Sequence, residues 1–223
     1  MEYHSLKNRE KLISFSEAIK NGLSPDKSLY FPQKIHKLSQ SFFKEIKNMS
    51  VRDIALEIIH PYIGNSIAKG TLSKIIVDTL NFDFPLVQMS KNISVLELFH
   101  GPTLAFKDVG ARFMSRCLSY YLGKNEKITV LVATSGDTGG AVANGFMGLK
   151  GIDVVILYPK GKVSDLQERQ FTTLGENIKA ISVKGSFDDC QRFVKDAFID
   201  PEIKEKLNLT SANSINIARW LPQ

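Results

Sequence analysis

Short runs rich in β-branched residues alternate with helical patterns in the second half of the chain, and this alternation limits the possible folds. Three runs have the length of a buried strand: 128–133, 154–158 and 178–183. Apolar residues recur at helical spacing around them, over about 108–122, 140–149, 164–174 and 187–198. Strands that alternate with helices at this pitch predict βαβ units, and therefore an α/β fold with a parallel sheet covered by helices.

The first 92 residues follow a different pattern. Apolar positions at helical spacing over 51–59 predict a helix, and a second helix is predicted to begin near Phe15, where Ser14 or Ser16 could cap it. The sequence from Gly22 to Asp26 predicts a turn. We therefore expect a mostly helical N-terminal domain, residues 1–92, followed by an α/β domain, residues 93–223.

Composition excludes several classes of function. The 223 residues are 43% hydrophobic and 23% charged, which is ordinary for a soluble globular protein. The net charge of +6 is spread along the chain, so no nucleic-acid partner is predicted. No apolar run approaches the roughly 18 residues of a membrane helix, and the start lacks a signal-peptide core, so we expect no membrane partner and a cytoplasmic location. The two cysteines, Cys117 and Cys190, lack metal-ligand spacing, so no metal site is expected.

One lysine, Lys107, lies between an apolar stretch and the start of the 108–122 helix. A lysine reacts with an aldehyde only as the neutral amine, and the preceding Leu104-Ala105-Phe106 would disfavour the ammonium form. From the local pattern alone, the simpler interpretation is that Lys107 begins a helix with its amine in water. His100 precedes the Gly101-Pro102 turn and is a candidate wall of any site there.

A polar, glycine-rich turn, Thr134-Ser135-Gly136-Asp137-Thr138-Gly139-Gly140, follows the 128–133 run. Its glycines permit close backbone approach, and its hydroxyls and the helix N-terminus offer donors to an anion. Such a turn lies at the carboxyl end of a parallel strand, where open α/β sheets bind ligands. Its glycine spacing matches neither a P-loop nor a dinucleotide fingerprint, and a capping loop without a ligand has the same spacing. Together with Lys107, the turn predicts a lysine that carries a cofactor beside a cradle for an anionic group.

The two motifs, residues 100–108 and 135–142, resemble those of threonine synthase of the microbial type. The resemblance extends to 14–18 and 22–32, which look like the N-terminal extension of that family, and to the block Ser211-Ala212-Asn213-Ser214-Ile215-Asn216-x-x-Arg219. Four separated motifs in the right order are specific. One departure is Lys27-Ser28, where the family has two glycines, and it bears on the geometry of that turn.

The resemblance implies a pyridoxal 5'-phosphate enzyme with the type II fold of the tryptophan synthase β chain. Such a lyase converts O-phosphohomoserine and water into threonine and phosphate, the last step of threonine biosynthesis. Lys107 matches the lysine that is bonded to the cofactor. Asp137 stands where many relatives have an asparagine that faces the ring hydroxyl, and an ionised aspartate has no hydrogen bond to donate there. The residues that match the loop for the substrate carboxylate are Thr134, Ser135, Gly136, Thr138 and Gly139.

The resemblance assigns no role to His100, Asn213, Asn216 or Arg219, and the family's second glycine-rich loop, which holds the cofactor phosphate, has no counterpart here. We therefore expect the chain to be the N-terminal part of a longer enzyme, inactive by itself, and to self-associate through apolar surface near Trp220 and Leu221 and on the sheet edge. A naturally short paralogue is the alternative. Two rival functions are a serine or threonine dehydratase of the same fold and a non-catalytic phosphate- or partner-binding domain.

Overall fold

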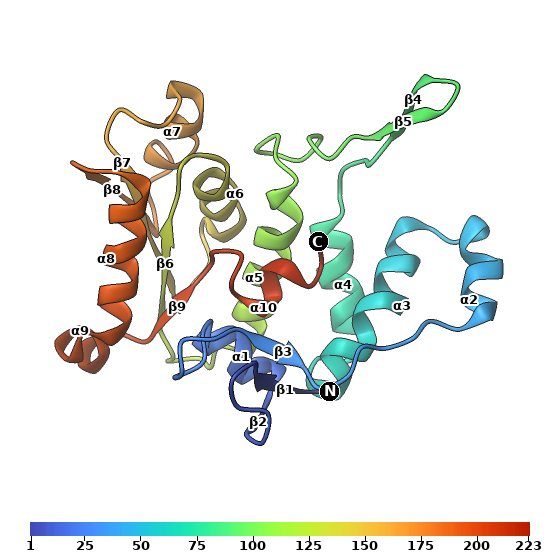
Figure 1. Cartoon of the computed structure of the whole chain (residues 1–223), viewed down its shortest axis with the longest axis horizontal. Helices are drawn as coiled ribbons and strands as arrows, with labels where there is room; N and C mark the ends of the chain where they lie inside the picture. The colour runs from blue at the N-terminus through green and yellow to red at the C-terminus, as the bar shows by residue number, and fades with distance from the viewer.

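A four-stranded parallel sheet organises the second half of the molecule, in a computed structural model that describes residues 1–223 (Figure 1). The strand order is β8-β7-β6-β9. Its strands are β6 (Ile128–Ala133), β7 (Ile152–Pro159), β8 (Ile178–Val183) and β9 (Leu209–Ser211). The three predicted strands are confirmed. The three-residue β9 was not predicted, because a strand so short has no measurable periodicity.

Helices cover both faces of this sheet, which explains why its strands are continuous apolar runs. Successive residues of β6 point to opposite faces: Val130 and Val132 belong to the main core with α5 and α6, whereas Leu131 and Ala133 pack on α8. Figure 1 shows α8 on one side of the sheet and α5 and α6 on the other. The bounds are α5 (Lys107–Tyr121), α6 (Asp137–Phe146), α7 (Asp165–Thr172), α8 (Phe187–Ile199) and α9 (Pro201–Lys206).

The N-terminal part consists mainly of helices, as predicted. These are α1 (Phe15–Asn21), α2 (Gln40–Glu45), α3 (Val51–Ile63) and α4 (Lys69–Thr79), with short 3₁₀ turns at 46–48 and 64–66. Ser14 caps α1: its hydroxyl accepts from the Glu17 amide at 3.2 Å, and the Glu17 carboxylate accepts from the Ser14 amide at 2.9 Å. A small antiparallel sheet, β2-β1-β3, was not predicted, because its strands have three or four residues each; they are β1 (Glu2–Ser5), β2 (Leu12–Ser14) and β3 (Tyr30–Pro32).

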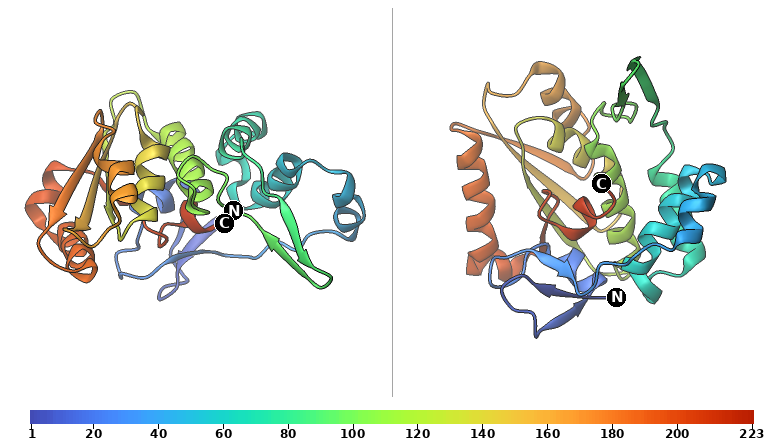
Figure 2. Two further views of the ribbon diagram at one scale, coloured as in Figure 1. Left: turned by 90° about the horizontal axis from the view of Figure 1, so that it is seen from above. Right: turned by 45° about the vertical axis from the view of Figure 1, so that its right-hand side comes forward.

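The last element of the chain packs against α5 and the N-terminal part. The short helix α10 (Ile217–Trp220) lies against α5, and the ring of Trp220 stacks on that of Phe31 with centroids 5.7 Å apart. Figure 2 shows α10, in red, beside α5. The apolar surface expected at Trp220 and Leu221 is only partly bare, since both side chains are partly buried against the core.

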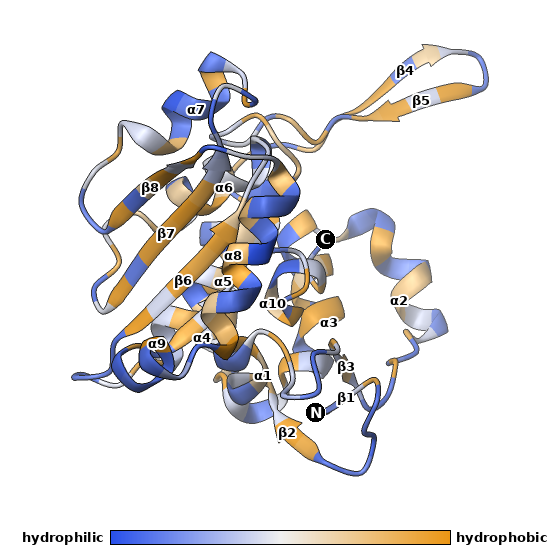
Figure 3. Ribbon diagram, turned by 60° about the vertical axis from the view of Figure 1, so that its left-hand side comes forward, coloured by the Kyte–Doolittle hydropathy of each residue, from blue (hydrophilic) through white to orange (hydrophobic).

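Apolar surface is exposed elsewhere, on a hairpin formed by β4 (Leu86–Ser90) and β5 (Ile93–Leu96) that projects from the body (Figure 3). Its exposed apolar side chains are Leu86, Met89, Ile93, Val95 and Leu96.

No helix of the structure is long and apolar enough to cross a membrane. Both cysteines are buried as free thiols, and no cluster of metal-ligating side chains occurs.

Candidate active site

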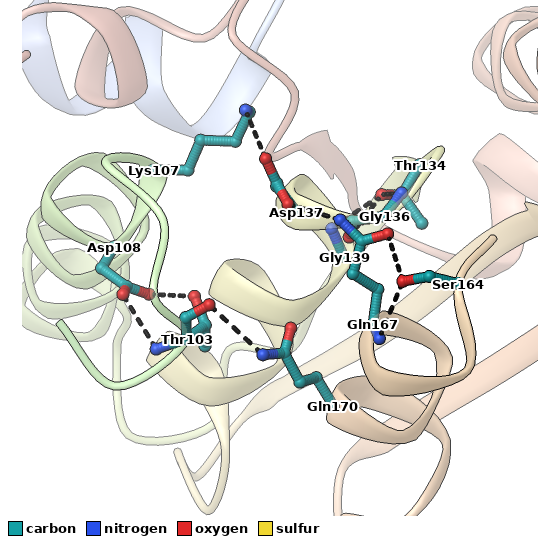
Figure 4. A network of polar contacts seen from close by, with 10 residues as sticks. All are labelled: Thr103, Lys107, Asp108, Thr134, Gly136, Asp137, Gly139, Ser164, Gln167 and Gln170. Carbon is teal, nitrogen blue, oxygen red and sulfur yellow. Dashed lines mark hydrogen bonds and ion pairs between the residues drawn. The ribbon is translucent and has the colours of Figure 1, made fainter. Parts of the chain in front are cut away.

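Lys107 and Asp137 meet at the edge of the sheet where β6 ends. Lys107 is the first residue of α5 and Asp137 the first residue of α6, so the packing of these two helices sets their separation. The Nζ atom of Lys107 lies 3.5 Å from Oδ2 of Asp137 and 4.3 Å from the centre of the Phe106 ring (Figure 4). The structure thus brings together the lysine and the aspartate that the two separate motifs supplied.

The surroundings of Lys107 differ from the expected apolar setting. The side chains of Leu104 and Phe106 are 64% and 46% exposed, so they do not exclude water from the amine. The Lys107 side chain itself remains 21% exposed. The groups that lie next to the amine are the Asp137 carboxylate and the Phe106 ring.

The turn before Lys107 is fixed by a buried carboxylate. Asp108 accepts hydrogen bonds from the amide of Thr103 at 2.9 Å and from its hydroxyl at 2.5 Å. Gly101 packs against the same carboxylate, and a Cβ there would come closer than 3.0 Å to it. The Gly-Pro turn and the aspartate that follows the lysine therefore act together to hold the start of α5.

The 134–139 turn is shaped from within by Thr134. Its buried hydroxyl oxygen accepts from the amides of Gly136 and Gly139, at 3.0 and 2.8 Å, and donates to the Gly136 carbonyl. Gly136 has φ +148°, a conformation that favours glycine. In contrast, the hydroxyls of Ser135 and Thr138 make no hydrogen bond within the chain, and they lie at the start of α6, where helix N–H groups lack partners.

The block at 211–219 supports the floor of this site. The Asn213 side chain donates to the Ala133 carbonyl at 2.8 Å and accepts from the Ala133 amide at 3.3 Å, which holds the last residue of β6. Asn216 caps α10 and donates to the Ile19 carbonyl at 2.9 Å. Arg219 is fully buried and donates to the Ala212 carbonyl, and its burial lowers the pKa of the guanidinium to about 10. These residues connect the site to the N-terminal part.

His100 makes its contacts with its own neighbours in the chain. Its Nε2 is 2.7 Å from a Glu97 carboxylate oxygen, its ring stacks on that of Phe99, and its side chain is 38% exposed. The prediction that His100 forms a wall of the site finds no support in these contacts.

The sequence analysis expected the helix α7, over 164–174, but did not connect its residues with the site. Its residue Gln167 donates to Oδ1 of Asp137 at 2.6 Å, and Gln170 donates to the Thr103 carbonyl at 3.2 Å (Figure 4). The order of the elements could have indicated this role of α7. Because β7 pairs with β6 in parallel and ends at the same edge, the helix after β7 begins beside the glycine-rich turn.

Comparison with known proteins agrees with this arrangement. Residues 2–80 match the family model for the threonine synthase N terminus, and residues 85–220 match that for pyridoxal-phosphate dependent enzymes. The chain is 48% identical to threonine synthase of Buchnera aphidicola from Acyrthosiphon pisum and 43% identical to that of Escherichia coli. Each match covers 100% of this chain and 52% of the relative, so the chain spans about half the length of these curated relatives.

Solved structures give the same result. The crystal structure of threonine synthase from Escherichia coli superposes with a TM-score of 0.93 at 43% identity, over 100% of this chain and 52% of that one. A pyridoxal-phosphate-bound threonine synthase from Brucella melitensis superposes with a TM-score of 0.91 at 39% identity, over 100% and 49%. The chain therefore belongs to the family of pyridoxal-phosphate-dependent enzymes, and it carries the N-terminal region typical of the threonine synthases.

Proposed function

We propose that these residues form one side of the active site of a threonine synthase, a lyase that converts O-phosphohomoserine and water into threonine and phosphate. The observation that carries the proposal is the Lys107–Asp137 pair, in a chain that is similar to threonine synthases over its whole length. The division into residues 1–92 and 93–223 stays part of this proposal, with the second part belonging to the catalytic domain.

The residues at the site fit pyridoxal phosphate. An aldehyde needs an accessible amine, and the Lys107 side chain is 21% exposed at the mouth of the site. Anionic groups need donors, and the first turn of α6 and the unpaired hydroxyls of Ser135 and Thr138 offer them. When bound, the cofactor supplies an electron sink for charge that develops on the substrate.

The chain's own residues would then bind the substrate and hold a proton. Lys107 is the base that would take a proton from the substrate and return it, and Asp137 would keep the charged amine directed into the site. Gly136 and Gly139 would contribute mainly the shape of the turn, because their amides already donate to Thr134. The substrate carboxylate would bind at the Ser135 and Thr138 hydroxyls.

We expect these 223 residues by themselves to be inactive and to bind pyridoxal phosphate weakly. Lys107 and the 134–139 turn would contact the cofactor from one side, and the chain spans about half the length of its relatives. Each missing charge-assisted hydrogen bond to a phosphate would cost roughly 1.5–3 kcal/mol, so two of them would weaken binding about a hundredfold or more. A tight, stoichiometric cofactor absorbance band from the isolated chain would contradict this expectation.

A hybrid enzyme tests the reaction. Residues 1–223 would replace the matching segment of Escherichia coli threonine synthase, to which they are 43% identical. We expect phosphate release from O-phosphohomoserine, and loss of that release in the Lys107→Ala hybrid. Dehydratase activity without phosphate release would select the sister enzyme. A third outcome is a folded hybrid with neither activity, in which pyridoxal phosphate and borohydride do not trap Lys107. That outcome would favour the non-catalytic binding domain.

A further inference from the structure

Gln167 lies between a helix-capping serine and the site aspartate. Its amide nitrogen donates to Oδ1 of Asp137 at 2.6 Å, and its amide oxygen accepts from the hydroxyl of Ser164 at 2.8 Å (Figure 4). Ser164 is the N-cap of α7, and its hydroxyl also accepts from the Gln167 backbone amide. Because Ser164 engages the oxygen of the side-chain amide, the nitrogen is the end that faces Asp137.

The glycine-rich turn makes room for this glutamine. A Cβ at Gly136 would lie 2.5 Å from both Cδ and Oε1 of Gln167, and Gly136 has φ +148°. Backbone in such a conformation costs free energy for any residue with a side chain. The turn therefore combines a glycine-only conformation with close contact to a side chain from a different helix.

A neutral amide is suited to orient a carboxylate without cancelling its charge. Gln167 occupies Oδ1 of Asp137, and Oδ2 then faces the Lys107 amine at 3.5 Å. The Asp137 side chain is 47% exposed, so without this donor, water would compete for the carboxylate and alternative rotamers would become accessible.

We propose that Gln167 is a positioning residue that turns the Asp137 carboxylate toward Lys107, with Ser164 setting the direction of its amide. The inference rests on the proposed role of Lys107 as the reacting amine. Helix α7 also contacts the other side of the pair, because Gln170 donates to the carbonyl of Thr103, in the turn that precedes Lys107. This second contact reaches the backbone of the turn and touches neither Lys107 nor Asp137.

Competitive acetylation tests the proposal on the chain itself, without cofactor. The rate at which acetic anhydride modifies each lysine at fixed pH follows the fraction of unprotonated amine, and mass spectrometry measures it for each peptide. Asp137→Asn removes the ion pair, so acetylation of Lys107 should become about two- to fivefold faster, the effect of losing an exposed pair. Gln167→Ala should accelerate Lys107 in the same direction, by about twofold.

The decisive measurement is the double variant. If Gln167 acts through Asp137, Gln167→Ala should have no further effect on Lys107 in the Asp137→Asn background. An equal effect in both backgrounds, or no effect when Asp137 is present, would overturn the proposal. Gln170→Ala is the matched control, since it removes the same amide from the same helix without touching Asp137, and it should leave Lys107 unchanged.

Two further measurements distinguish a disturbed fold, a failure of the proposed function and a failure of the positioning role. Lys20, which pairs with Glu126 at 2.8 Å in another part of the molecule, serves as the internal standard for an intact fold. If the acetylation rate of Lys20 changes in Gln167→Ala, that variant is replaced by Gln167→Met, which has a side chain of similar size. Gln167→Met should accelerate acetylation of Lys107 in the same way. Trapping with pyridoxal phosphate and borohydride tests Lys107 separately: no selective trapping contradicts the proposed function, whereas an unchanged acetylation rate in the Gln167 variants contradicts the positioning role.

Discussion

Replacement of Gly110 by alanine tests how the C-terminal helix α10 is fixed on the helix that begins with Lys107. Gly110 lies within α5, where alanine is intrinsically better than glycine by about 1 kcal/mol. Packing opposes this gain. A Cβ at Gly110 would come closer than 3.0 Å to the backbone carbonyl of Arg219 and would lie 2.7 Å from the Gln223 amide nitrogen.

The clash is with backbone, so it cannot be relieved by a rotamer change. Helix α10 would have to move, and it carries Ile217 and Ala218, both fully buried. Overpacking of this kind costs typically 1–3 kcal/mol, and partial exposure of an isoleucine adds to that loss because its full burial contributes about 1.5–3 kcal/mol. The packing cost exceeds the gain in helix propensity, and we expect Gly110→Ala to lower the free energy of unfolding by about 2 kcal/mol.

Urea denaturation followed by circular dichroism measures this difference. With a slope of about 1–3 kcal/mol per M, the midpoint should fall by roughly 1 M. Gly70→Ala in α4 is the matched control, because nothing lies within 4 Å of a Cβ there and the same substitution should be neutral or stabilising by up to about 1 kcal/mol. If Gly110→Ala proves as stable as the wild-type chain, α10 does not pack on α5 as described.

Three other substitutions have defined outcomes. Lys27 has φ +62°, a left-handed conformation that glycine adopts without strain, so Lys27→Gly should raise the free energy of unfolding in urea by about 0.5 kcal/mol. This is the strain relieved less the added entropy of glycine in the unfolded state. Hydrogen bonds from the hydroxyls of Ser24 and then Ser5 hold the pKa of Asp26 below its usual range. The stability that this lowered pKa contributes is present above about pH 4 and is lost as the pH falls. The thermal midpoint of Asp26→Asn should therefore decline less between about pH 4.5 and 2.5 than that of the wild-type chain. Lys107→Arg in the hybrid enzyme should fail as completely as Lys107→Ala, in cofactor absorbance and in phosphate release, because arginine does not lose its proton.

The sequence by itself determined the elements with strong local signals. The β-branched runs gave three strands of the parallel sheet, because residues buried on both faces leave no polar alternation. A helix was expected to begin near Phe15 with Ser14 or Ser16 as its cap, and the structure has Ser14 in that position, in a capping box with Glu17. The ligand-binding role of the turn after β6 stays a prediction, which rests on the shared edge at the carboxyl ends of parallel strands.

The tertiary structure decided what no local pattern contains. The Lys107–Asp137 pair joins residues from two helices, and its 3.5 Å separation depends on how α5 packs on α6. Gln167 belongs to a third helix, and its amide reaches Asp137 only because β7 lies beside β6 in the sheet. The short strands of the N-terminal sheet and β9 form for the same reason: with three or four residues each, they are stabilised by their neighbours rather than by their own sequence.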